Sequence, residues 1–110
     1  MASVKVFRGD TWKRVWVLKD DGGNPVDLSG ATARLHVRDA SGAKVAEAST
    51  ADGRLVVTAA QGRVDMTVPA AAMQLAPGAY RFDLELTYPG GVVQTIEQST
   101  LVVLEDMSRD

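Results

Sequence analysis

The chain has 110 residues, of which 45% are hydrophobic and 24% charged, with a formal net charge of -2 and no cysteine. This length fits one domain, and the composition is that of a soluble globular protein rather than a disordered or fibrous one. The slight acidic balance removes the usual electrostatic basis for nonspecific binding of nucleic acid or of an anionic membrane. Without cysteine, neither disulfides nor thiolate metal sites can form.

The amino terminus has no apolar region of signal-peptide length, and no stretch approaches the roughly 20 apolar residues of a transmembrane helix. We therefore expect synthesis in the cytoplasm without a signal peptide, and no membrane partner. A single domain over residues 1–110 is expected, with a short amino-terminal arm over about residues 1–6. Residues 4–8 could instead form a short first strand that ends at Gly9 and Asp10.

The first long strand is expected over residues 11–19, which are rich in aromatic and β-branched side chains. Trp12 and Trp16 share one face of this strand with Arg14, whereas Val15 and Val17 lie on the other face. Apolar side chains on both faces indicate a strand that is covered on both sides or that lies at a contact.

Turn residues then divide the chain into further short strands. Residues 20–30 form a polar loop that we expect to cross between two sheets. Strands are expected over residues 31–38 and 44–47, joined by a turn at Ser41 and Gly42. Further strands are expected over residues 55–58 and 63–68, and the segment 69–75 predicts one short helical turn behind its proline.

The clearest strand pattern lies in residues 80–88, where hydrophobic and polar side chains alternate strictly. Such a period of two is typical of a central strand of an antiparallel sheet, half buried by one face. The final apolar run, residues 92–104, is expected to pair with it through the turn at residues 89–91, and residues 105–110 form a charged tail. These elements together predict an all-β protein, an immunoglobulin-like antiparallel β-sandwich of about seven to eight strands with one short helical turn.

No group of residues predicts catalysis. Asp83 and Glu85 lie on one face of a strand, as an acid and base pair could, but a solvated sheet face has the same pattern. His36 is the only histidine and has no cysteine or second histidine as a partner. We expect no catalytic residue, no metal site and no cofactor, and hence no enzyme.

Two other motifs favour turns over binding sites. The tripeptide at residues 8–10, Arg-Gly-Asp, is recognised by some cell-surface receptors when it is displayed at a loop tip, but here it is expected to be a turn between two strands. The 20–30 loop has four side chains with oxygen atoms that could bind calcium, but they lack the order of an EF-hand calcium loop. They are Asp20, Asp21, Asn24 and Asp27.

The candidate interface residues are Trp12, Arg14, Trp16 and Tyr88, because large aromatic side chains often anchor protein contacts. Each tryptophan could instead be a core residue. For Trp16 the pattern favours the core, whereas for Trp12 core and interface are equally favoured.

The order of several short segments resembles that of the small immunoglobulin-like domains of tailed bacteriophages and prophages, in particular the amino-terminal domain of baseplate upper proteins and related tail or neck proteins. The resemblance covers nearly the whole chain. It is carried by R-G-D-T-W at residues 8–12, G-N-P-V-D-L-S-G-A-T-A-R-L-H-V-R-D at 23–39, D-G-R-L at 52–55 and P-G-A-Y-R-F-D-L-E-L at 77–86.

The resemblance implies a virion structural protein, an adaptor that docks on the tail, neck or baseplate and positions fibres. Its expected partners are other virion proteins, and several symmetric copies or a homo-oligomer are expected in the particle. A capsid decoration protein is one alternative. Another is a carbohydrate-binding β-sandwich in which Trp12 or Tyr88 stacks on sugar rings.

Overall fold

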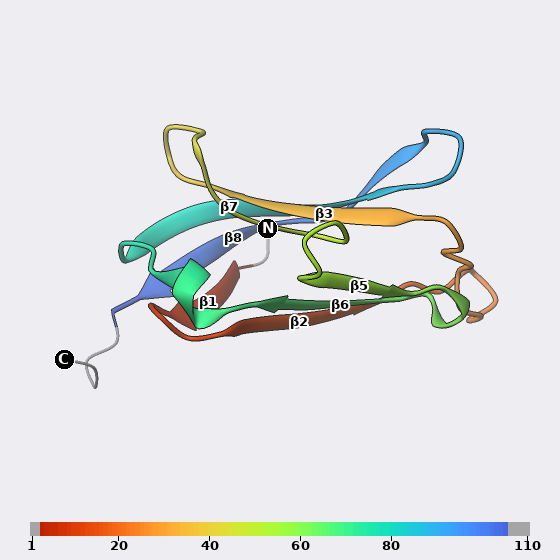
Figure 1. Ribbon diagram of the computed structural model, residues 1–110, viewed down its shortest axis with the longest axis horizontal. Helices are drawn as coiled ribbons and strands as arrows, with labels where there is room; N and C mark the ends of the chain where they lie inside the picture. Colours follow the sequence, from red (N-terminus) through yellow and green to blue (C-terminus); the bar gives the residue numbers. More distant parts are fainter. Residues whose placement is uncertain (1–2, 106–110) are drawn as a thin grey trace.

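The computed structural model describes residues 3–105, which form two β-sheets packed face to face (Figure 1). The larger sheet has five strands in the order β1-β8-β7-β3-β4. Their bounds are Ser3–Phe7 for β1, Val93–Leu104 for β8, Gly78–Thr87 for β7, Thr32–Arg38 for β3 and Lys44–Ser49 for β4.

The smaller sheet has three strands in the order β2-β6-β5, with bounds Trp12–Val17, Arg63–Val68 and Leu55–Thr58. Two short 3-10 turns, Ala59–Gln61 and Ala70–Met73, flank β6. The second of these lies in the segment from which one helical turn was predicted, and the first was not foreseen. The sheet order is that of an immunoglobulin-like β-sandwich, which confirms the predicted fold class.

β7 is the centre of the larger sheet, as the strict alternation of its sequence predicts. Phe82, Leu84 and Leu86 point inward and are buried, and β8 and β3 flank the strand in antiparallel register. At its start the Tyr80 hydroxyl donates a hydrogen bond of 2.6 Å to the Ala76 carbonyl oxygen. This is the tyrosine corner found at the same place in many immunoglobulin-like domains.

The core lies between the sheets and is built from the inward-facing half of each strand. Its largest fully buried side chains are Leu28, Leu35, Leu55, Met66, Met73, Leu84, Leu86 and Leu101. Leu28 belongs to the loop that leads from β2 to β3, so this loop does cross between the sheets, as expected, and contributes to the core while doing so.

Two expectations about the amino-terminal segment are corrected. Of the two interpretations of this segment, the short first strand over residues 4–8 is confirmed and the arm over residues 1–6 is not, because Ser3–Phe7 pairs with Thr100 to Leu104 of β8. Residues 1–2 lie outside the described part. This pairing is parallel, so the sandwich is not purely antiparallel. The reason is that the chain changes sheets at the turn after Phe7, and β1 and β2 therefore do not form a hairpin. Of the charged tail, residues 106–110 also lie outside the described residues.

Candidate protein-binding surface

A cluster of polar side chains joins the two sheets inside the sandwich. Glu97 of β8 points inward, and its Oε1 atom accepts hydrogen bonds from Trp16 Nε1 at 2.8 Å and from Arg14 Nη2 at 3.0 Å. The other carboxylate oxygen, Oε2, accepts a bond of 2.7 Å from the hydroxyl of buried Ser99. Because β2 and β8 belong to different sheets, this cluster ties the smaller sheet to the larger one.

Aromatic rings surround the Arg14 guanidinium. Its Cζ atom lies 5.3 Å from the centre of the Trp16 ring and 5.8 Å from the centre of the Phe82 ring, within cation-π range. Phe82 in turn packs edge to face against Trp12, with 5.2 Å between ring centres. Trp12 Nε1 and Arg14 Nη1 are buried and have no hydrogen-bond acceptor among the described residues.

Glu97 stays ionised in this setting. Its partial burial acts to raise its pKa, but the hydrogen bonds from Ser99 and Trp16 and the positive charge of Arg14 together outweigh burial and leave the pKa below the usual glutamate value. The result is a half-buried ion pair that fixes the position of Arg14.

The structure separates the four predicted interface residues. Trp12 is 3% exposed and Trp16 is 9% exposed, so both indoles belong to the core. For Trp16 this agrees with the favoured interpretation. For Trp12 it corrects the interface alternative, and it also removes this ring as a stacking platform for sugars. The physical reason is that both side chains point to the inner face of β2, where the larger sheet covers them.

Arg14 and Tyr88 are only partly buried. Arg14 belongs to the inter-sheet cluster and shares the inner face of β2 with the two tryptophans. Tyr88 follows β7, packs against the edge of the core, and donates a hydrogen bond of 2.9 Å from its hydroxyl to Gln94 Oε1. The hydrogen bond of Tyr88 is therefore separate from those of the Arg14 cluster, and the four residues do not form one site.

The apolar surface of β2 lies on its outer face. Val15 is 50% exposed and Val17 is 55% exposed, and across the sheet Val56 of β5 is also 55% exposed. The register places Val15 and Val56 on either side of Asp65, and Val17 beside Arg63. We call these five residues the valine face. The strand is therefore not covered on both sides by the described part of the chain, because Val15 and Val17 are at least half exposed there.

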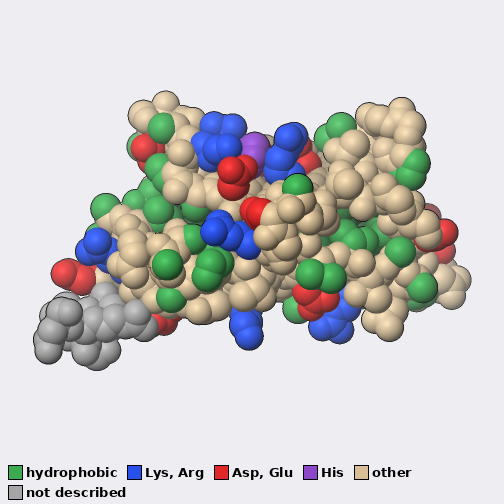
Figure 2. All heavy atoms as spheres, in the orientation of Figure 1, with side chains coloured by type: hydrophobic (Ala, Val, Ile, Leu, Met, Phe, Trp, Pro, Cys, Tyr) green, Lys and Arg blue, Asp and Glu red, His purple; other side chains and the backbone are tan. Residues whose placement is uncertain are grey.

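An ion pair occupies the middle of the valine face. Arg63 Nε donates to Asp65 Oδ2 at 2.9 Å, and Arg63 Nη2 donates to Asp65 Oδ1 at the same distance. The hydrogen bonds and charge of Asp65 raise the pKa of Arg63 above its ordinary value. In Figure 2, hydrophobic side chains lie beside charged ones of both signs along the lower edge of the view, over this sheet. Neighbouring exposed apolar side chains are a mark of protein contact surfaces, and this patch differs from the usual interface in having its charged pair at the centre and not at the rim.

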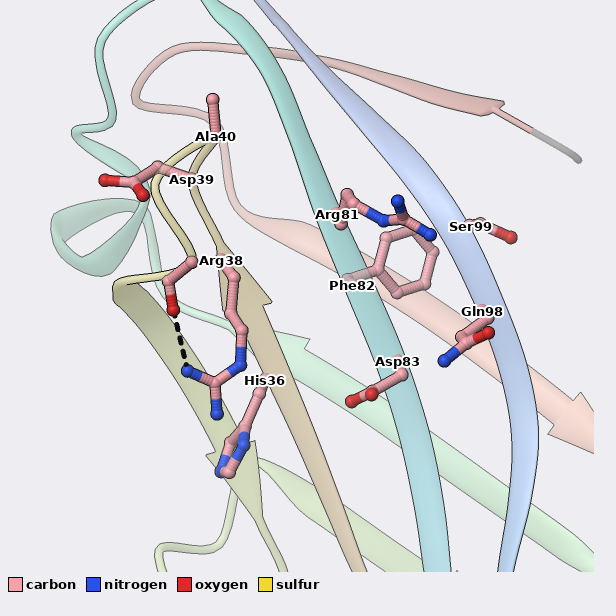
Figure 3. Close-up of a pocket in the computed structure, with 10 residues that line it drawn as sticks. His36, Arg38, Asp39, Ala40, Arg81, Phe82, Asp83, Gln98 and Ser99 are labelled. Carbon is pink, nitrogen blue, oxygen red and sulfur yellow. Dashed lines mark hydrogen bonds between the residues drawn. The ribbon is translucent and has the colours of Figure 1, made fainter.

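The outer face of the larger sheet is different in character. Charged side chains of both signs gather around His36 at the top of Figure 2. A hollow of about 350 Å³ opens there between β3, β7 and β8, lined among others by His36, Arg38, Arg81 and Asp83 (Figure 3). Asp83 points toward β3, whereas Arg81 extends toward β8. The Arg34 to Glu85 ion pair at 3.3 Å places Glu85 in the charge pattern of this face, as expected of a solvated surface.

His36 is held in its neutral form on this face. Partial burial lowers its pKa, and the positive charges of Arg34, Lys44 and Arg38 lower it further, while Glu47 opposes them. The Nε2 atom of His36 lies 3.7 Å from Glu47 Oε2, but Glu47 is also bound by Lys44 at 3.2 Å. Partial burial and the three positive charges therefore lower the pKa of His36 more than the carboxylate of Glu47, which is shared with Lys44, raises it.

The remaining motifs form turns. The backbone N–H of Gly9, in the Arg-Gly-Asp segment, donates to the Met73 carbonyl oxygen at 2.9 Å, and Gly9 is buried between β1 and β2. In the acidic loop, Asp20 Oδ1 accepts from the backbone N–H groups of Gly22 and Asn24, and Asp27 binds Ser29. Within residues 3–105, no group of three or more acidic or histidine side chains is placed to hold a metal ion. None of the described segments forms a helix long and apolar enough to cross a membrane.

Sequence reasoning missed Glu97 and Ser99. Residues 92–104 were treated as one apolar run. At every second position, however, Glu97 and Ser99 share one strand face with Leu101 and Val103, which are buried. This alternation, together with Arg14 at an inward position of its own strand, was the signal that two opposite charges could meet between the sheets.

The fold defines an immunoglobulin-like β-sandwich with three exposed valines and an ion pair on the outer face of its smaller sheet. Comparison with known protein families finds no match, and comparison with curated proteins finds none either. Among solved structures the chain is similar to CopC from Methylosinus trichosporium OB3b, at 16% identity and a TM-score of 0.47, over 80% of this chain and 74% of that one. It is also similar to Drosophila OTK extracellular domains 3-5, at 16% identity and a TM-score of 0.44, over 96% of this chain and 33% of that structure.

Proposed function

We propose that this chain is a structural protein of a bacteriophage virion, an immunoglobulin-like adaptor that docks on the tail, neck or baseplate and positions fibres. The sequence resemblance to phage and prophage domains over nearly the whole chain is the reason for assigning the chain to a phage particle. The observation that carries the adaptor role is the valine face, an apolar surface around an ion pair on the outer face of the smaller sheet, which no other part of the described chain covers.

The valine face suits a protein partner better than a small ligand. Its three valines are each at least half exposed and lie on the outer face of the two edge strands of one sheet, whereas a hollow of about 350 Å³ lies on the larger sheet. A partner that covers Val15, Val17 and Val56 removes their exposed methyl groups from water, which contributes about 25 cal/mol per Å² of apolar area. The Arg63 to Asp65 pair at the centre adds directional hydrogen bonds that fix the orientation of the partner.

Quantitative mass spectrometry of purified particles tests the proposal, with the copy number of this chain measured against the portal and major capsid proteins. Portal-like abundance supports a tail, neck or baseplate adaptor. Capsid-like abundance supports the decoration alternative instead, and absence from the particle refutes the virion role.

A pair of variants tests the valine face in the same particles. The double variant Val15→Asp with Val56→Asp is expected to lower incorporation at least tenfold, because it places two charges in the contact. The control is Val45→Asp on β4, another exposed valine, which lies in the larger sheet. Equal incorporation of the double variant and the control would show that the partner binds elsewhere.

A further inference from the structure

β2 is an edge strand whose outer side remains unpaired. It pairs with β6 over all six residues without a shift in register, and within residues 3–105 no strand pairs with its other side. Edge strands of soluble proteins are usually protected by bulges, prolines, charges or short length. The other edge strands of the two sheets are β5, which has only four residues, β1, which has five, and β4, whose pairing with β3 contains a register shift. β2 contains neither a bulge nor a proline.

The backbone groups that face the open edge follow from the observed hydrogen bonds. The N–H of Leu18 donates to the Gly62 carbonyl oxygen at 2.8 Å, which continues the register of β2 with β6. Because successive residues of a strand bond to opposite sides, the even-numbered residues of β2 bond to β6. The N–H and C=O groups of Lys13, Val15 and Val17 therefore point to the open edge.

The same three residues carry the outward-facing side chains of β2. A strand added at this edge would place alternate side chains beside Lys13, Val15 and Val17, and would extend the valine face by one strand.

The charges of β2 determine which kind of strand can pair with its open edge. β2 carries Lys13 and Arg14, with Lys19 just beyond its end, and no acidic residue lies between Trp12 and Lys19. In an antiparallel pair of two β2 strands centred on Val15, each Lys13 would lie opposite Val17 of the other copy, so neither lysine would gain a counter-charge. An acidic side chain on the added strand would instead neutralise Lys13.

We propose that the free edge of β2 binds an extended segment of a partner protein by strand addition, with apolar side chains beside Val17 and Val15 and an acidic side chain beside Lys13. Main-chain hydrogen bonds supply the affinity in this mode and the alternate side chains supply the specificity. The inference deepens the adaptor role of the proposed function, but it requires only that the partner is a protein and not that it belongs to a virion.

A tethered probe strand tests the edge directly. The probe, Thr-Val-Thr-Val-Thr-Glu-Thr, is fused to the amino terminus of the full chain through a flexible Gly-Ser linker of about 20 residues, which spans roughly 25 Å. In antiparallel register its two valines face Val17 and Val15, and its glutamate faces Lys13. The tether holds the probe at an effective concentration of about 1 mM, which makes a weak strand contact measurable.

Amide hydrogen exchange is the readout, compared with a fusion in which every probe residue is Gly or Ser. We expect exchange at the edge amides of Lys13, Val15 and Val17 to slow at least tenfold. Protection at another strand edge, or at none, overturns the proposal. Because this measurement needs no particle, absence of the chain from virions would leave its outcome unaffected, so the two proposals fail separately.

Two substitutions distinguish strand addition from docking on the valine face. Val15→Pro removes one edge N–H and is tolerated on an edge strand, whereas Val15→Thr keeps the N–H and the shape. Strand addition predicts that proline abolishes protection at Lys13 and Val17 and that threonine retains most of it. Equal protection in both variants overturns the proposal.

A charge reversal provides a test that does not need the proline variant to fold. Lys13→Glu is expected to weaken protection by the probe at least threefold, and a probe with lysine in place of its glutamate is expected to restore it. Failure of the swapped pair to recover protection would contradict the assigned place of the acidic residue.

Discussion

Substitution of Glu97 by glutamine tests whether the inter-sheet cluster stabilises the fold. The carboxylate accepts three hydrogen bonds, from Trp16, Arg14 and Ser99, and glutamine retains one acceptor oxygen for them. Arg14 then stays half-buried between aromatic rings without its counter-charge. Hydrogen bonds to charged groups contribute about 1.5 to 3 kcal/mol each when buried, and partial exposure of this pair reduces that value. We expect Glu97→Gln to destabilise the fold by about 2 kcal/mol.

The expected change in melting temperature follows from the size of the chain. With an unfolding entropy of about 2.1 cal/mol/K per residue, 110 residues give a fall of about 4 °C per kcal/mol, and hence about 9 °C for this variant. Urea unfolding and thermal melts measure both quantities. The matched control is Glu85→Gln, which breaks the more exposed pair with Arg34 and is expected to lower stability by less than about 0.5 kcal/mol.

A double-mutant cycle isolates the ion pair. Arg14→Met keeps an apolar side chain between the rings, and the combination with Glu97→Gln is expected to be more stable than the sum of the single losses by about 1 kcal/mol or more. Strict additivity would refute the reasoning that the pair acts as a unit.

The pH dependence of the Glu97→Gln effect has a defined sign. Because the folded pKa of Glu97 is lowered, its contribution is present above the ordinary glutamate pKa and is lost as pH falls through the folded value. The wild-type advantage over Glu97→Gln should therefore disappear in acid. An advantage that persists there would show that charge is not its source.

Three further predictions concern the core, one loop and the outer face. Trp12→Ala should reduce stability by about 3 to 5 kcal/mol in urea unfolding, because the indole is buried. An unchanged urea midpoint would indicate that the Trp12 side chain lies at the surface. Gly62→Ala should destabilise far more than Gly53→Ala in the same assay, since both have positive φ but only at Gly62 would the new Cβ lie 2.5 Å from a backbone oxygen, that of Leu18. The lowered pKa of His36 means that its neutral form is favoured on folding, so stability should be full above pH of about 6.5 and fall below it. His36→Gln should flatten that fall between pH 8 and pH 5, and an identical pH profile would contradict the assignment.

Much of the fold could be predicted because the strands alternate cleanly. The pattern of β7 fixed its central place, and turn residues at Ser41 with Gly42 and at 89–91 correctly joined neighbouring strands. The parallel pairing of β1 could not be predicted, since a five-residue strand carries no information about which sheet it joins. Residues 70–73 formed a helical turn as their composition predicted.

The candidate surface was harder to predict than the fold. Alternation placed Val15 and Val17 opposite the tryptophans, but it could not show which face of β2 the second sheet would cover. Tryptophan at the surface and tryptophan in the core have the same pattern in a single sequence. Trp12 is buried because the partner ring of Phe82 and the larger sheet lie above it, and both contacts are distant in the chain.

The parallel arrangement of β1 and β8 has a mechanical consequence. Ser3 pairs with Thr100 and Phe7 pairs with Leu104, so the two strands point the same way while the chain enters at Ser3 and leaves beyond Leu104. A pulling force applied through these two points acts along the strands in opposite directions, and it loads the hydrogen bonds between them in shear. All of these bonds must then break together, whereas a hairpin pulled from its open end separates one bond at a time. Force applied between Ser3 and Leu104 would therefore be resisted by all five residue pairs of this pairing at once.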